Sequence, residues 1–184
     1  MREMGLLAPK VGINYTLLGD DGEVTGGALK QAGISANRRA EVQDIIDNLW
    51  NDMSSEMSKR VVLDSKESNP GEAVRVYRLA ADRSYAEDRL RQFKDALGNK
   101  FGKKEGEILY DGMGSVNYFG WFGKLDLKVR FADVKYGDGR TVRQVAFSGK
   151  DPDSGKEITG GSFAADAYLR RFFGTTFDKA ESGN

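Results

Sequence analysis

The side chains of this chain that could do chemistry are carboxylates, lysines, arginines and hydroxyls, because its 184 residues include no histidine and no cysteine. That composition excludes histidine general bases, thiol nucleophiles, disulfides and zinc sites built from Cys or His. Catalysis would have to rest on Asp, Glu, Lys, Tyr, Ser, Thr or Arg, or on a metal with oxygen ligands. We therefore expect no enzyme activity, and an enzyme using carboxylate or lysine chemistry is the alternative.

Two acidic stretches carry the residue types of cation ligands. "DPDSGKE" at 151–157 places Asp151, Asp153 and Glu157 around Gly155. A calcium loop needs more oxygen ligands, typically with a bidentate Glu at its twelfth position, and this spacing does not fit that pattern. We interpret this stretch, and "GDDGE" at 19–23, as solvated turns. Neither a Walker A nor a G-x-G-x-x-G pattern occurs, so we expect no cofactor.

Charged side chains elsewhere also favour a solvated surface. The chain has 28 basic and 28 acidic residues, so it lacks the positive charge of a dedicated nucleic-acid binder. A predicted hairpin has a basic outer face without aromatic residues, whereas sheets that bind RNA expose aromatics there. We expect no nucleic-acid partner. This face consists of Lys124, Lys128, Arg130 and Arg143, interrupted by Asp126 and Asp133, and a comparable acidic helix face carries Asp44, Asp47 and Asp52.

The strongest candidate for a binding surface is aromatic. "SVNYFGWFGKL" at 115–125 holds four aromatic residues within five positions, and a predicted closing helix brings a second group. The two groups either pack on each other inside the chain or form an interface with a partner or a second copy, since Trp, Tyr and Phe are enriched at interfaces. The candidate interaction residues are Tyr118, Phe119, Trp121, Phe122, Phe172, Phe173 and Phe177.

The elements that must position these residues follow from apolar periodicity. Steps of three and four from Val42 to Met57 predict one helix over Ser35–Ser58, with Ile45, Leu49, Trp50 and Met53 facing a sheet. Further helices are predicted after Thr25, from Ser84 to Gly98, over Lys103–Asp111 and after Ser162. Strands are predicted at Ile13–Leu18, on both sides of "NPG", at 124–131, at 141–148 and near Ile158.

One hairpin allows a prediction of register. A three-residue turn at Gly137-Asp138-Gly139 pairs Val134 with Val142, Phe131 with Val145, Val129 with Phe147 and Asp133 with Arg143. The apolar alternation breaks on both strands at the same level, which predicts a local twist or bulge shared by both.

These elements predict an α+β fold, with an antiparallel sheet of hairpins and a β-meander packed by one long amphipathic helix and several shorter ones. The length predicts one domain over 1–184. Within it we expect an N-terminal strand and short helix (1–34), a helix, strand pair and two helices (35–111), an aromatic loop, meander and closing helix (112–177), and a polar tail (178–184). No apolar run is long enough to span a membrane, and "MREMGLLAPKVGINY" lacks the apolar core of a signal peptide.

Several short motifs resemble a loose group of bacterial exported or membrane-anchored proteins of unknown function. They are "INYTLLGDDGEVTGGALKQAGIS", "EVQDIIDNLWNDM", "LRQFKDALGNKFG" and "YFGWFG" followed by a strand. The resemblance implies an extracytoplasmic regulatory or structural domain and transfers no catalytic residue; without it, a cytoplasmic location is expected. We therefore expect a non-enzymatic protein-interaction domain, with a protein partner or a homo-oligomer. A small-ligand or lipid-binding domain is a further alternative.

Overall fold

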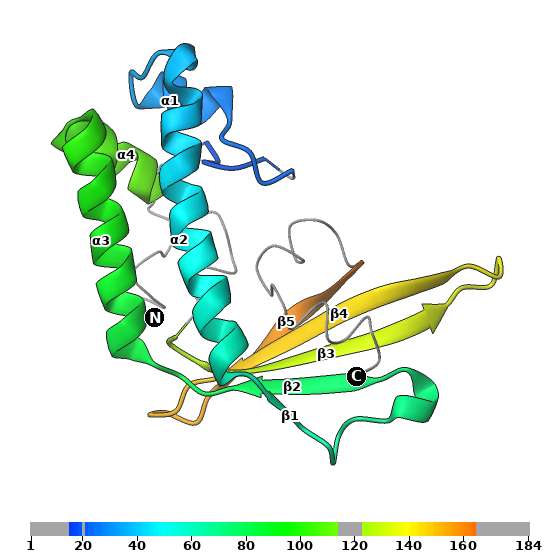
Figure 1. Cartoon of the computed structure of the whole chain (residues 1–184). Coiled ribbons are helices and arrows are strands. Elements are labelled where there is room, and N and C mark those ends of the chain that lie inside the picture. The colour runs from blue at the N-terminus through cyan, green and yellow to red at the C-terminus, as the bar shows by residue number, and fades with distance from the viewer. Residues whose placement is uncertain (1–14, 20, 114–122, 165–184) are drawn as a thin grey trace. The chain divides into compact units, whose positions relative to one another are not determined.

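The computed structural model describes residues 15–19, 21–113 and 123–164 (Figure 1). Within them the chain is an α+β protein with an antiparallel sheet, as predicted. Its contacts group into two compact units, each assembled from two separate stretches: residues 1–52 with 83–124, and residues 53–82 with 125–184. The first unit holds most of the helices and the second holds the sheet. The predicted single domain thus has an internal division into a helical unit and a sheet unit.

The helices of the first unit begin close to where the sequence predicts them. Thr25 caps α1 (Gly26–Gln31), and its hydroxyl oxygen accepts a hydrogen bond from the Ala28 N–H at 3.1 Å. Instead of starting directly after Ser35, α2 (Arg39–Arg60) follows a short 3-10 turn, η1 (Ala36–Arg38). The apolar face of α2 is confirmed as buried, apart from half-buried Ile45: it comprises Val42, Ile46, Leu49, Trp50, Met53 and Met57.

The division between the two units falls within α2, after Asp52. Met53, which we expected to face the sheet, and Met57 belong to the unit that contains it. Leu49 and Trp50 are buried too, but they belong to the helical unit. The apolar face of α2 is therefore divided between the two units, and its packing against the sheet stays a prediction.

Polar contacts at both ends of α3 (Arg83–Phe101) attach it to α2 in the antiparallel sense. Near the start of α3, the Arg89 guanidinium lies 3.2 Å from the Asp52 carboxylate. Near its end, the Lys100 ammonium lies 3.1 Å from Glu41, in the first turn of α2. The apolar residues that recur along α3 at steps of three and four are all buried: Ala86, Leu90, Phe93 and Leu97.

The predicted end of α3 at Gly98 is wrong, because the helix continues to Phe101. The chain turns instead at Gly102, whose φ of 106° is open to glycine but not to most residues, and α4 (Lys103–Gly112) follows. Gly98 lies against Gly106 of α4, with too little room for a side chain on Gly106. Gly98 is thus a residue of the helix–helix contact and not a terminator.

The sheet has the strand order β1-β2-β3-β4-β5, with every neighbouring pair antiparallel. In Figure 1 the strands follow one another across the sheet in sequence order. This is the predicted meander, in which each strand pairs with the next one along the chain. The bounds are β1 (Val62–Leu63), β2 (Arg75–Leu79), β3 (Asp126–Lys135), β4 (Thr141–Lys150) and β5 (Glu157–Ala164).

The predicted register of the β3–β4 hairpin is confirmed at all four pairs. The Tyr136 N–H donates to the Arg140 carbonyl at 2.8 Å, which closes the three-residue turn. Of the predicted twist or bulge, the bulge is contradicted, because the pairing runs without a shift from Asp126↔Lys150 to Lys135↔Thr141. The irregularity lies between β4 and β5, at Ala146/Ser148.

The break in apolar alternation has another cause. Side chains alternate along a strand, so Val134 and Val142 lie on the opposite face of the sheet from Phe131 and Val145. Both valines are half-buried. The second face also has a small apolar cluster of its own, so the sheet carries apolar residues on both sides; this cluster comprises Val74, Val76 and Ala132.

The end of the described chain corrects another prediction. Ser162 does not start a helix, because β5 continues to Ala164. Phe163 pairs with Val145 of β4 in that strand. The rest of the predicted closing helix lies outside the described residues.

Candidate functional site

The aromatic residues that the sequence marks as an interaction surface lie outside the described residues. Their packing on each other, and their role at an interface, stay predictions. They are Tyr118, Phe119, Trp121, Phe122, Phe172, Phe173 and Phe177.

The acidic stretch at 151–157 forms a turn, as predicted. One carboxylate oxygen of Asp151 accepts hydrogen bonds from the backbone N–H groups of Asp153, at 2.8 Å, and Ser154, at 3.1 Å. Gly155 has the positive φ, 68°, that the turn requires. Among the residues that the structure describes, no three His, Cys, Asp or Glu side chains gather closely enough to hold a metal ion.

The predicted basic face does not form one surface. Arg143 and Asp133 form the expected cross-strand ion pair, on the same face of the sheet as Phe131. Lys128 and Arg130 lie on the opposite face. Lys124 belongs to the helical unit and is half-buried, and this burial lowers the pKa of its amine.

An edge strand that the sequence does not single out carries the most exposed large apolar side chains among those that the structure describes. Val62 and Leu63 form β1, at the end of the strand order, and their relative exposures are 65% and 46%. Leu63 pairs with Tyr77, which is buried, and Val62 pairs with Arg78 on the other face. Since neighbouring side chains alternate, β1 presents one exposed apolar side chain on each face. The only sequence signal is "VVL", three apolar residues directly after a charged helix end.

The backbone of β1 also faces outward at one residue. The Asp64 N–H donates to the Val76 carbonyl at 2.8 Å, so residues 64 and 76 face each other as a hydrogen-bonded pair. Hydrogen-bonded and non-hydrogen-bonded pairs alternate along an antiparallel ladder. Leu63↔Tyr77 is therefore a non-hydrogen-bonded pair, and the N–H and C=O of Leu63 point away from β2.

The segment after β1 is fixed along the edge of β2 by its own polar groups. Asp64 forms the first turn, because its carboxylate accepts hydrogen bonds from the N–H groups of Lys66, at 3.1 Å, and Glu67, at 3.2 Å. The Ser68 hydroxyl donates to the Asp64 carbonyl at 2.7 Å and accepts from the Val76 N–H at 3.0 Å. The edge of β2 beyond β1 is thus satisfied by a side chain, and along this side of the sheet the described outward-facing backbone groups are those of β1.

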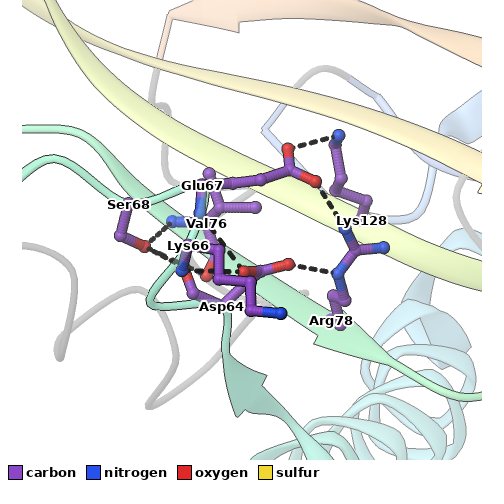
Figure 2. Close-up of polar contacts among 7 residues, drawn as sticks. All are labelled: Asp64, Lys66, Glu67, Ser68, Val76, Arg78 and Lys128. Atoms are coloured by element: carbon purple, nitrogen blue, oxygen red, sulfur yellow. Dashed lines mark hydrogen bonds and ion pairs between the residues drawn. The ribbon is translucent and has the colours of Figure 1, made fainter.

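A network of ion pairs ties this segment to the face of the sheet (Figure 2). Arg78 donates from Nε to Asp64 at 2.5 Å and from Nη2 to Glu67 at 2.5 Å. The other oxygen of Glu67 lies 2.6 Å from the ammonium of Lys128, the residue paired with Arg78 across β2 and β3. Glu67 therefore bridges two neighbouring strands.

The electrostatics of this network suit positioning better than proton transfer. The hydrogen bond from Arg78 holds the pKa of the Asp64 carboxyl below its usual value. A general base works best when its pKa is near the operating pH, so a carboxylate held this strongly in its charged form is a poor one. What the arrangement can do is keep the backbone of β1 in an extended, open conformation.

These observations define the class of protein: an α+β chain with a five-stranded antiparallel meander and an exposed apolar edge strand beside an ordered charge network. No family model matches the chain, and no curated protein or solved structure matches it significantly. Within the described part of the chain, no helix combines the length and the apolar character that crossing a membrane requires.

Proposed function

We propose that this chain is a protein-interaction domain that binds an extended segment of its partner along β1. One observation carries the proposal: β1 is an edge strand with exposed apolar side chains on both faces and with the N–H and C=O of Leu63 directed outward. An open strand edge is a template on which another chain can add a strand, and several peptide-binding domains use this mode.

The surroundings of β1 support this proposal. Strand addition draws affinity from main-chain hydrogen bonds, and side chains on alternate positions of the partner contact the two faces. Here Leu63 supplies the main-chain donor and acceptor, and Val62 and Leu63 supply an apolar contact on either face. The turn at Asp64 and the ion pairs of Glu67 hold the strand in place before binding, which lowers the entropy cost of association.

A small-ligand or lipid-binding domain, and an enzyme using carboxylate or lysine chemistry, stay alternative predictions. Neither has an observation in the described residues that favours it over strand addition.

The test uses a proline at the outward-facing position. Leu63→Pro removes an N–H that points away from β2, and proline is tolerated at such edge positions, so the sheet should stay folded. The full chain, as bait, is used to capture partners from the cells that make it, and the captured protein is then purified for a binding measurement. We expect Leu63→Pro to weaken that binding at least tenfold while the melting curve shows the chain still folded.

Two control variants make the outcome specific. Leu63→Val keeps the N–H and the apolar character and should bind like the wild type. Tyr136→Ser removes the exposed aromatic side chain of the hairpin turn, 43% exposed, and should also leave binding unchanged. Wild-type binding by a folded Leu63→Pro variant, or loss of binding in Tyr136→Ser, would contradict the assignment of β1. If neither the wild type nor any variant binds a captured protein after purification, the interaction function itself is contradicted.

A further inference from the structure

We propose that the segment bound by β1 carries acidic side chains beside its apolar ones; this inference rests on the proposed function. It comes from the charges that remain unpaired around β1 once the network of Figure 2 is counted.

The acidic groups next to β1 are already neutralised. Asp64 and Glu67 both accept from the Arg78 guanidinium, and Glu67 also pairs with Lys128. Two carboxylates therefore face two cations, and together they contribute no net charge to the edge. They offer a cationic partner little attraction, because a new cation would have to compete with contacts that are 2.5 and 2.6 Å long.

The lysine beside β1 is not neutralised. Lys66 is exposed, and its ammonium makes no ion pair with the described residues. Figure 2 shows its side chain drawn without a dashed line from its ammonium, while its backbone N–H is held by Asp64. At the other end of β1, Lys59 has 69% of its side chain exposed and lies 3.5 Å from Glu56 within its own helix. Lys59 is therefore paired, and Lys66 is the cation beside β1 that the ion pairs of the described residues leave unneutralised.

This charge distribution argues against a second copy of the chain as the occupant. In a two-fold antiparallel pairing centred on Leu63, the turn after β1 in one copy comes next to the end of α2 that precedes β1 in the other. Lys66 of one copy then approaches the basic residues Lys59 and Arg60 of the other, and like charges brought together oppose this pairing. An extended segment with Asp or Glu at the level of Lys66 meets this lysine with the opposite charge.

The test titrates the 15N-labelled full chain with two synthetic peptides that differ only in charge. The probes are acetyl-EVTVE-amide and acetyl-KVTVK-amide, followed through the amide signals of Leu63 and Lys66. An exposed ion pair changes a binding affinity only by a small factor. We therefore expect the acidic peptide to bind about threefold to fivefold more tightly than the basic one. Lys66→Glu should reverse this preference, because it turns attraction into repulsion at the same position. Lys30→Glu, a charge reversal on α1 in the other unit, is the matched control and should leave the preference unchanged.

The outcomes separate the two proposals. If both peptides shift the Leu63 signal with equal affinity, strand addition stands and the acidic preference is overturned. If neither peptide shifts the Leu63 signal at millimolar concentration, the binding role of β1 is overturned together with the inference that rests on it. Reversal in Lys66→Glu, with the Lys30→Glu control unchanged, supports both.

Discussion

Gly106 of α4 lies directly against the backbone of Gly98 in α3. A Cβ atom at position 106 would lie 2.6 Å from the Gly98 nitrogen and 2.7 Å from its Cα. The contact is one-sided, because a Cβ at position 98 would meet nothing within 4 Å. The two helices therefore approach each other through the missing side chain of one glycine, and this pair offers a matched test.

Gly106→Ala should destabilise the chain, because the added methyl group meets backbone atoms that cannot rotate away. Overpacking typically costs about 1–3 kcal/mol, and a backbone clash should lie at the upper end. Gly98→Ala should instead raise stability by about 0.5–1 kcal/mol, since alanine replaces glycine inside a helix without a clash. Urea unfolding of both variants measures this, and similar effects of the two substitutions would contradict the one-sided contact.

Gln43 joins α2 to the loop before α1 through a nearly buried amide. Its Oε1 accepts from the buried Val24 N–H at 2.9 Å, and its Nε2 donates to the Gly22 carbonyl at 3.3 Å and to Asp47 at 2.8 Å. Gln43→Leu should cost about 1–3 kcal/mol, because it leaves the Val24 N–H without its acceptor. Asp47→Asn keeps an oxygen acceptor and should stay within about 0.5 kcal/mol of the wild type. A Gln43→Leu variant as stable as the wild type would show that the amide is not needed.

Ala73 occupies a backbone conformation that favours glycine. Its φ is 55°, and it ends the turn between Asn69 and Val74 that leads into β2. The left-handed conformation costs a residue with a side chain about 1–2 kcal/mol of stability, and glycine avoids this cost. Glycine also makes the unfolded chain more flexible than alanine does, which lowers stability by about 0.4–1 kcal/mol. Ala73→Gly should therefore raise the free energy of unfolding by about 0.5–1 kcal/mol, measured in urea. Ala73→Val should lower it; the opposite order would rule out strain at this position.

The free energy of unfolding at acidic pH should depend on Glu41. Hydrogen bonds from Arg38 and Lys100 lower the pKa of Glu41 to about 2 from its usual 4.5. A carboxyl with a lowered folded pKa stabilises the protein above its unfolded pKa, and that contribution is lost as the pH falls through its folded value. The gap in stability between the wild type and Glu41→Gln should therefore be full above pH 4.5 and shrink towards pH 2. An NMR titration of the Glu41 carboxyl checks the cause, and a midpoint near 4.5 would contradict it.

The sequence alone predicts the elements whose information is local. The Thr25 cap, the apolar face of α2 and the stripe of α3 all repeat within a few residues, so their periodicity can be read directly. The β3–β4 register is also local, because the turn length at 137–139 fixes which residues face each other.

Predictions from the sequence fail where the same local pattern can have two different structural causes. Gly98 matches a helix end, but it lies inside α3, where its backbone is the surface that Gly106 contacts, and nothing in the neighbouring sequence indicates that contact. The broken alternation at Val134 and Val142 resembles a bulge, but it reflects apolar residues on the second face of the sheet. In both cases the deciding neighbour belongs to a different element.

The candidate site depended most on tertiary structure. Composition excluded histidine and cysteine chemistry, because an absent residue type is absent from every fold. Whether Val62 and Leu63 are core or surface could not be read from "VVL", since their exposure depends on which strands pair with β1. The pairing of Glu67 with both Arg78 and Lys128 joins residues up to 61 positions apart. Such contacts form only when the meander brings the strands together, so only the tertiary structure determines which charges are neutralised and which remain available at the edge.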